Sequence, residues 1–165
     1  MIHRKEKNFG KIGQKKMDSN KEIESWFPNI IGKPYKIINE LNFEENEFNC
    51  IAFTLNIYDT YIWTNEKSWP YDKIPRNSGV IGFKKLYELY GYIETNNLEY
   101  ENGYDKIIFY SKNNYPTHAA KQFGKNWRSK CGKYIIEHKS DWICGDSEYS
   151  YGNITFIMKK KNNFQ

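Results

Sequence analysis

Apolar residues recur at helical spacing in two stretches of the chain. In "FNCIAFTL", residues 48–55, they occupy positions i, i+3, i+4 and i+7, and Asn46 or Asn49 can supply the N-cap. This spacing predicts a helix whose first turn contains Cys50. A second helix is predicted over "GVIGFKKLYELYG", residues 79–91, whose last glycine suits the position just after a helix.

The hydrophobic period changes from helical to alternating after Gly91. Four β-rich segments follow, separated by clusters of Asn, Gly and Pro, at residues 104–112, 116–123, 133–139 and 153–160. They are typical of an antiparallel meander. Helices followed by strands predict an α+β fold, with the N-terminal helices packed on an antiparallel β-sheet.

Length and charge indicate one domain preceded by a basic arm. The chain has 165 residues and a net charge of +5, and residues 1–20 hold six Lys or Arg against two acidic residues. The arm, residues 1–20, therefore carries +4 and residues 21–165 only +1. We expect a flexible arm followed by a single domain over residues 21–165. Charge confined to a tail, with no binding motif, argues against nucleic acid as a partner.

The sequence shows no membrane-spanning segment, no signal peptide and no paired cysteine motif, which indicates the location and redox state of the chain. No apolar run is long enough to cross a membrane, and the first residues lack the apolar core of a signal peptide. The sequence thus predicts a cytoplasmic protein with no membrane partner. The three cysteines, Cys50, Cys131 and Cys144, are odd in number and lack CxxC spacing, so reduced thiols are expected.

Cys50 has the position of a nucleophile and needs a base. Unpaired N–H groups at a helix N-terminus favour a thiolate, and histidine is the side chain that titrates near neutrality. Of the three histidines, His3 falls in the predicted arm, which leaves His118 and His138.

The two remaining histidines are symmetric about one glycine-bounded stretch. Interpreted as a turn, "GKNWRSKCG", residues 124–132, is centred on Arg128 and pairs residues whose numbers sum to 256. His118 and His138 fulfil that condition and would be direct cross-strand neighbours, with Gln122 on the same face. A bulge would change this register.

These positions predict a cysteine-dependent site. Cys50 would be the nucleophile, His118 the base and His138 the residue that orients it. Asn49 and Gln122 would support the oxyanion together with helix N–H groups. A candidate substrate cleft would be lined by Trp63, Trp69, Trp127 and Lys130.

Three motifs resemble an uncharacterised bacterial family of domains of unknown function. They are "NCIAF", "PTHAAKQ" and "WRSKCG", which are similar to that family's NCIAW-like, THAAxQ-like and WxSKLG-like motifs. Phe53 replaces the usual Trp and Cys131 the usual Leu. The resemblance covers about residues 26–158. More distantly the chain resembles NlpC/P60 and CHAP amidases, which implies a papain-like fold and implicates Cys50, His118 and His138.

The expected function is a cysteine hydrolase or acyltransferase acting on an amide or thioester, with a protein or peptide substrate and no cofactor. Three alternatives stay open. Cys50 and His118 can be ordinary core residues. Cys50 and two imidazoles can bind zinc, although no fourth ligand is evident. The domain can also be a non-catalytic binding module, such as a toxin, immunity or defence component, that recognises its partner through an aromatic cleft.

Overall fold

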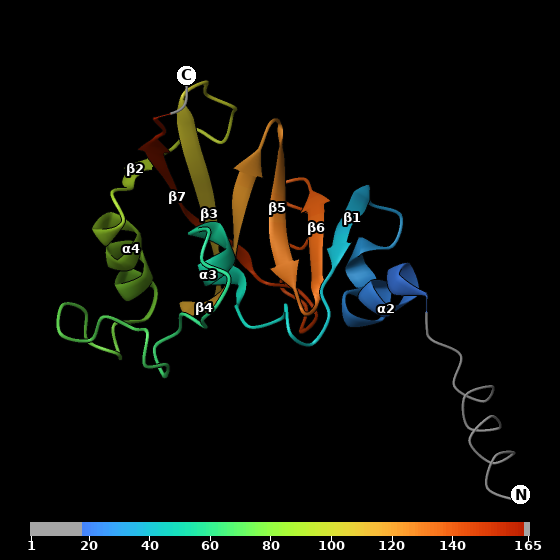
Figure 1. Cartoon of the computed structure of the whole chain (residues 1–165). Coiled ribbons are helices and arrows are strands. Elements are labelled where there is room, and N and C mark those ends of the chain that lie inside the picture. The colour runs from blue at the N-terminus through green and yellow to red at the C-terminus, as the bar shows by residue number, and fades with distance from the viewer. Residues whose placement is uncertain (1–17, 164–165) are drawn as a thin grey trace, which may run out of the picture.

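The computed structural model describes residues 18–163 and is built on one seven-stranded sheet (Figure 1). Every strand pair in it is antiparallel, in the order β1-β6-β5-β4-β3-β7-β2. The strands are β1 (Tyr35–Glu40), β2 (Ile93–Thr95), β3 (Tyr104–Lys112), β4 (Tyr115–Phe123), β5 (Asn126–Cys131), β6 (Tyr134–His138) and β7 (Asn153–Lys161).

Helices cover both faces of the sheet. The helical segments are α2 (Ser19–Trp26), the 3-10 turn η1 (Pro28–Ile30), α3 (Cys50–Thr54) and α4 (Gly79–Leu89). Helices α3 and α4 share one apolar core with the sheet residues of one face, such as Ile107 and Phe109. Helix α2 packs on the opposite face at the β1 end, where its Ile23 meets Tyr134 and Ile136 (Figure 1).

The predicted α+β class and antiparallel sheet are confirmed. Strand β3 has the predicted bounds, and α4 and three further predicted strands lie where the pattern placed them. The predicted arm falls mostly outside the described residues, and its last two residues, Ser19 and Asn20, begin α2 under an N-cap from Asp18.

The predicted turn at residues 124–132 is wrong. Six residues of this stretch form a separate strand, β5, and a tight turn lies at each end of it. Gly124 and Gly132 have positive φ values of 59° and 57°, which suits glycine in such turns.

Strands β4 and β5 separate along part of their length. They pair only between Lys121–Phe123 and Asn126–Arg128. Beyond this point β4 remains paired with β3 and β5 with β6, so residues 118–120 and 129–131 line a fork in the sheet. Helix α3 contacts both strands (Figure 1). The fork thus brings the start of α3 to the middle of the sheet.

Candidate functional site

The side chain of Asn49 fixes the start of α3. Its Oδ1 accepts the backbone N–H groups of Ala52 and Ile62, both at 3.1 Å, and its Nδ2 donates to the Ile62 carbonyl at 2.8 Å. The capping residue therefore ties the helix to the loop that follows it. Cys50 is the first residue of the helix, as predicted, and is half-buried.

The Cys50 thiol is held in its neutral form. Burial raises its pKa from the ordinary 9.0 to about 11, although the backbone N–H groups of Ala119 and Ile51 and the charge of Lys130 act in the opposite direction. A helix of five residues has only a small dipole, so the effect of burial on the Cys50 pKa outweighs that of the helix N-terminus. The expectation that the helix N-terminus makes Cys50 a thiolate is therefore wrong for the resting protein.

Cys50 is coupled electrostatically to groups on both faces of the sheet. A charge on its sulfur raises the pKa of Tyr87, which lies on α4, and also the pKa values of Cys131 and Tyr151. Cys131 belongs to the core on the α2 face, and Tyr151 packs against that core.

His118 lies on β4 at the edge of the fork. Its ring is 1% exposed and stacks on Tyr151 at a centroid distance of 4.2 Å. Its Nε2 atom is buried and has no hydrogen-bond partner. Burial, and secondarily the charge of His138, hold the pKa of His118 well below 6.5, so the ring is neutral at pH 7. A neutral imidazole can accept a proton.

His138 has a partner on each ring nitrogen. Its Nδ1 lies 2.6 Å from the Lys139 carbonyl oxygen and therefore donates, so Nε2 accepts from the Ser129 hydroxyl at 2.7 Å. Burial lowers its pKa from 6.5 to about 4. Trp142 stacks on the ring at 5.1 Å.

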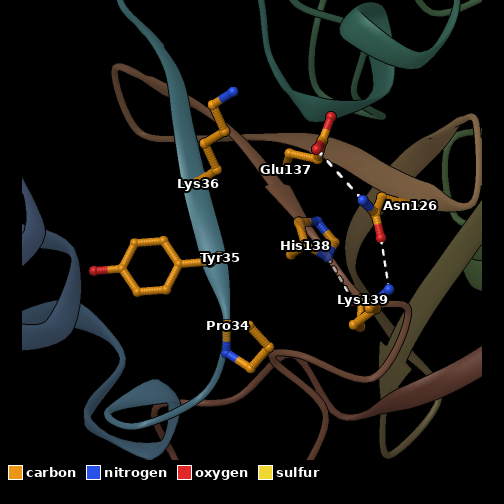
Figure 2. Close-up of a pocket in the computed structure, with 7 residues that line it drawn as sticks. All are labelled: Pro34, Tyr35, Lys36, Asn126, Glu137, His138 and Lys139. Carbon is orange, nitrogen blue, oxygen red and sulfur yellow. Dashed lines mark hydrogen bonds between the residues drawn. The ribbon is translucent and has the colours of Figure 1, made fainter.

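A surface pocket of about 230 Å³ adjoins His138 between β1, β5 and β6 (Figure 2). In Figure 2 Asn126 bridges two neighbours, donating to Glu137 at 3.4 Å and accepting from Lys139 at 2.8 Å. Both nitrogens of His138 already have partners, so this pocket presents no free imidazole.

The predicted cross-strand pairing of the two histidines is wrong. Trp127 of β5 lies opposite His138 on one side and opposite Gln122 of β4 on the other. A complete strand therefore separates His118 from His138, because the stretch interpreted as one turn contains β5. The two histidines still interact electrostatically, since a charge on His138 lowers the pKa of His118. No hydrogen bond within residues 18–163 joins either ring to Cys50.

The remaining predicted site residues do not form one cleft. Gln122 donates to the Leu98 carbonyl at 3.0 Å and so faces away from Cys50. Trp63 and Trp69 pack in the α3–α4 core, whereas Trp127 belongs to a core on the other face. Only Lys130 of this set is close to Cys50, and its Nζ also donates to the Gly132 carbonyl at 2.7 Å.

Two residues of the fork were not predicted from sequence. Ser129 bridges His138 and Cys131, at 2.7 Å and 3.8 Å respectively. Tyr151 covers His118 from the segment that precedes β7. Ser129 could have been found from its alternation with Trp127 and Cys131, which is typical of a strand. No local signal identifies Tyr151.

The described residues bear on two of the alternatives. No group of three or more His, Cys, Asp or Glu side chains within residues 18–163 is placed to hold a metal ion. Zinc binding by Cys50 and the two histidines therefore has no support. The described helices include none that is long and apolar enough to cross a membrane.

Comparison with known proteins identifies a family. Residues 41–159 match the family model described as a domain of unknown function, DUF7689. This confirms that the chain contains a domain of unknown function, which covers Cys50, His118, His138 and the fork. The match bears neither on the three motifs nor on the resemblance to NlpC/P60 and CHAP amidases. No curated protein and no solved structure matches the chain.

Proposed function

The chain belongs to the DUF7689 family, and we propose that it is a cysteine-dependent hydrolase or acyltransferase of papain-like type acting on an amide or thioester. Cys50 is the nucleophile and His118 the proton acceptor. Asn49 positions the start of α3, and the N–H groups beside the sulfur offer donors for an oxyanion.

The unpartnered nitrogen of His118 carries the proposal. A buried polar atom without a partner costs free energy, so native structures keep few of them. Here such an atom belongs to a neutral imidazole at the fork, and the peptide N–H that follows it, that of Ala119, acts on Cys50. The Ala119 N–H acts on Cys50 from the α3 face, whereas the His118 ring lies on the opposite face against Tyr151, so the proposed proton transfer passes through the fork.

The neutral state of both groups determines the order of events. The thiol gives its proton to Nε2 of His118 as the sulfur attacks the substrate carbonyl carbon, and the carbonyl π electrons move to the oxygen. When that oxyanion collapses, the bond to the leaving amine or thiol breaks, and His118 returns the proton to it. Water then cleaves the thioester on Cys50, or another nucleophile takes the acyl group.

His138 has a supporting place in this scheme. Its ring is fixed by Ser129 and the Lys139 carbonyl, and its protonation is opposed by burial. A neutral His138 keeps the pKa of His118 from falling further, because the two charges would repel each other.

Acyl-enzyme formation tests the proposal. The intact chain is incubated with p-nitrophenyl acetate, and the acetylated residue is located by mass spectrometry. We expect one acetyl group on Cys50, absent in Cys50→Ser and slowed about a hundredfold or more in His118→Gln. Cys144→Ser is the matched control, because Cys144 is a half-buried thiol outside the fork, and it should acetylate like the wild type.

The same experiment separates the alternatives. A binding module would show no acetyl group on Cys50 while circular dichroism shows every variant folded. Acetylation shared equally among the thiols, or unaffected by His118→Gln, would also contradict the catalytic assignment.

A further inference from the structure

An apolar groove runs beside α3. It has a volume of about 440 Å³, which lies within the usual range for small-molecule sites. One wall consists of the rings of Phe48, Phe53 and Tyr58 and the other of the side chains of Ile38, Leu41 and Ile135. Phe53 lies on α3 three residues after Cys50, and Phe48 directly precedes the N-cap residue Asn49. The groove is therefore lined by the helix that carries the thiol and by the residue before its cap.

The local backbone builds each wall of the groove. The register of β1 against β6 shifts between Ile37 and Asn39, which leaves Ile38 as an extra residue that lines the groove. On the other wall Phe48 and Tyr58 meet edge to face at 5.3 Å. Tyr58 is 51% exposed, so the groove opens to solvent along this ring.

The chemistry of the lining selects an uncharged occupant. Asn39, Glu45 and the Tyr58 hydroxyl are the polar groups of its lining. The nearest basic groups, Lys121 and Lys130, stand over the rings of Phe53 and Phe48 at 4.2 Å and 5.2 Å from the ring centroids and are not part of the lining. Glu45 already accepts the backbone N–H of Asn42 at 3.1 Å, and its negative charge at the groove disfavours an anion. An aliphatic chain would instead bury apolar surface against both walls.

We propose that this groove holds the apolar acyl group of the substrate that Cys50 attacks. The inference rests on the proposed function for the identity of the reacting bond, but the groove itself exists independently of Cys50. It narrows the substrate class to amides or thioesters that carry a medium-length aliphatic acyl chain.

Chain-length preference tests the inference. Acylation of Cys50 by p-nitrophenyl octanoate should exceed acylation by the acetate about a hundredfold, because the longer chain buries additional methylene groups. Ile38→Trp, which fills the groove from the half-buried bulge position, should remove this preference by slowing acylation by the octanoate. Val80→Trp on α4, half-buried on the same face but outside the groove, should retain it.

Direct binding separates the groove from the chemistry. Octanamide is titrated into the Cys50→Ser variant and followed by NMR, with chemical-shift changes expected at Phe48, Phe53 and Ile135. Binding that Ile38→Trp weakens about tenfold supports the groove. Octanamide binding without acylation of Cys50 in the wild type would keep the groove and overturn the proposed function. Acylation without chain-length preference, together with no octanamide binding, would overturn the groove alone.

Discussion

The two faces of the sheet at the fork differ in how far their candidate residues are covered. On the α3 face, Cys50 is half-buried beside an apolar groove. On the other face, His118 and His138 lie beneath Tyr151 and Trp142, which come from the segment between β6 and β7. The α3 face thus opens to solvent, whereas burial on the other face lowers the pKa values of both histidines and keeps them neutral.

Substitution of Trp142 removes the ring that covers His138 and so tests the role of this cover. This ring is 1% exposed and contacts His138, Phe27 and Tyr35. Trp142→Ala should lower the free energy of unfolding by about 3–5 kcal/mol in urea titrations. It should also raise the pKa of His138 toward 6.5 in NMR titrations, because burial is the cause of the depression.

Trp69→Ala is the matched change on the α3 face, where Trp69 is also 1% exposed and packs against Phe83. It should cost a similar free energy and leave the pKa of His138 near 4. A shift of that pKa in both variants would mean that general loosening, and not the local cover, controls the histidine.

The histidine face should also make the fold sensitive to acid. Well above pH 6.5, His118 and His138 are neutral in both the folded and the unfolded chain. As the pH falls from 6.5 toward 4, only the unfolded chain takes up the proton at His138, so the free energy of unfolding falls by about 3 kcal/mol. His118 adds to the loss in the same direction.

Urea titrations at several pH values measure this slope. The His138→Gln variant should lose much of it between pH 6.5 and pH 4, because the titrating group is gone. An unchanged slope in that variant would show that His138 is not a buried neutral histidine.

The thiol on the α3 face should react slowly with reagents that need a free thiolate. A pKa of about 11 instead of 9.0 leaves about a hundredfold less thiolate at neutral pH. Iodoacetamide should therefore label Cys50 about a hundredfold more slowly in the folded chain than in urea, and about tenfold faster for each added pH unit up to pH 10. Fast labelling at pH 7 would contradict the burial of this sulfur.

The smallest expected effect concerns the cap of α3. Asn49→Ala removes three hydrogen bonds and should cost about 2 kcal/mol in urea titrations. Asn46→Ala is the control, because the buried Oδ1 atom of Asn46 has no partner, and it should cost less than about 0.5 kcal/mol. Equal losses would show that Asn49 is not the cap that positions Cys50.

Local pattern predicted the elements better than it predicted their pairing. The helix at Cys50, its cap at Asn49 and the bounds of β3 all follow from spacing and side-chain chemistry. Strand β5 does not, because two glycines within nine residues suit one long turn as well as two tight ones. Because the stretch was interpreted as one turn, the histidines were predicted on neighbouring strands, whereas in the structure β5 lies between their strands.

The protonation states of Cys50 and His118 could not be predicted from the sequence either, because they also depend on contacts between distant parts of the chain. The position of Cys50 in a helix suggested a thiolate, but its pKa depends on how much of the chain buries it. The cover on His118 comes from Tyr151, 33 residues later in the chain, and no local rule indicates such a contact. Cys50 and His118 could be selected from sequence as candidates, whereas their protonation states depend on burial that the sequence does not show.

The pH dependence of Cys50 acetylation tests most directly whether Cys50 and His118 act together. The rate with p-nitrophenyl acetate is measured from pH 5 to pH 10 in the wild type and in His118→Gln. Base catalysis by His118 predicts a wild-type rate that reaches a plateau by about pH 7, since its pKa lies well below 6.5. In His118→Gln the rate should instead rise with pH toward the thiol pKa of about 11. A wild-type rate that rises in that same way, with no plateau, would contradict the account.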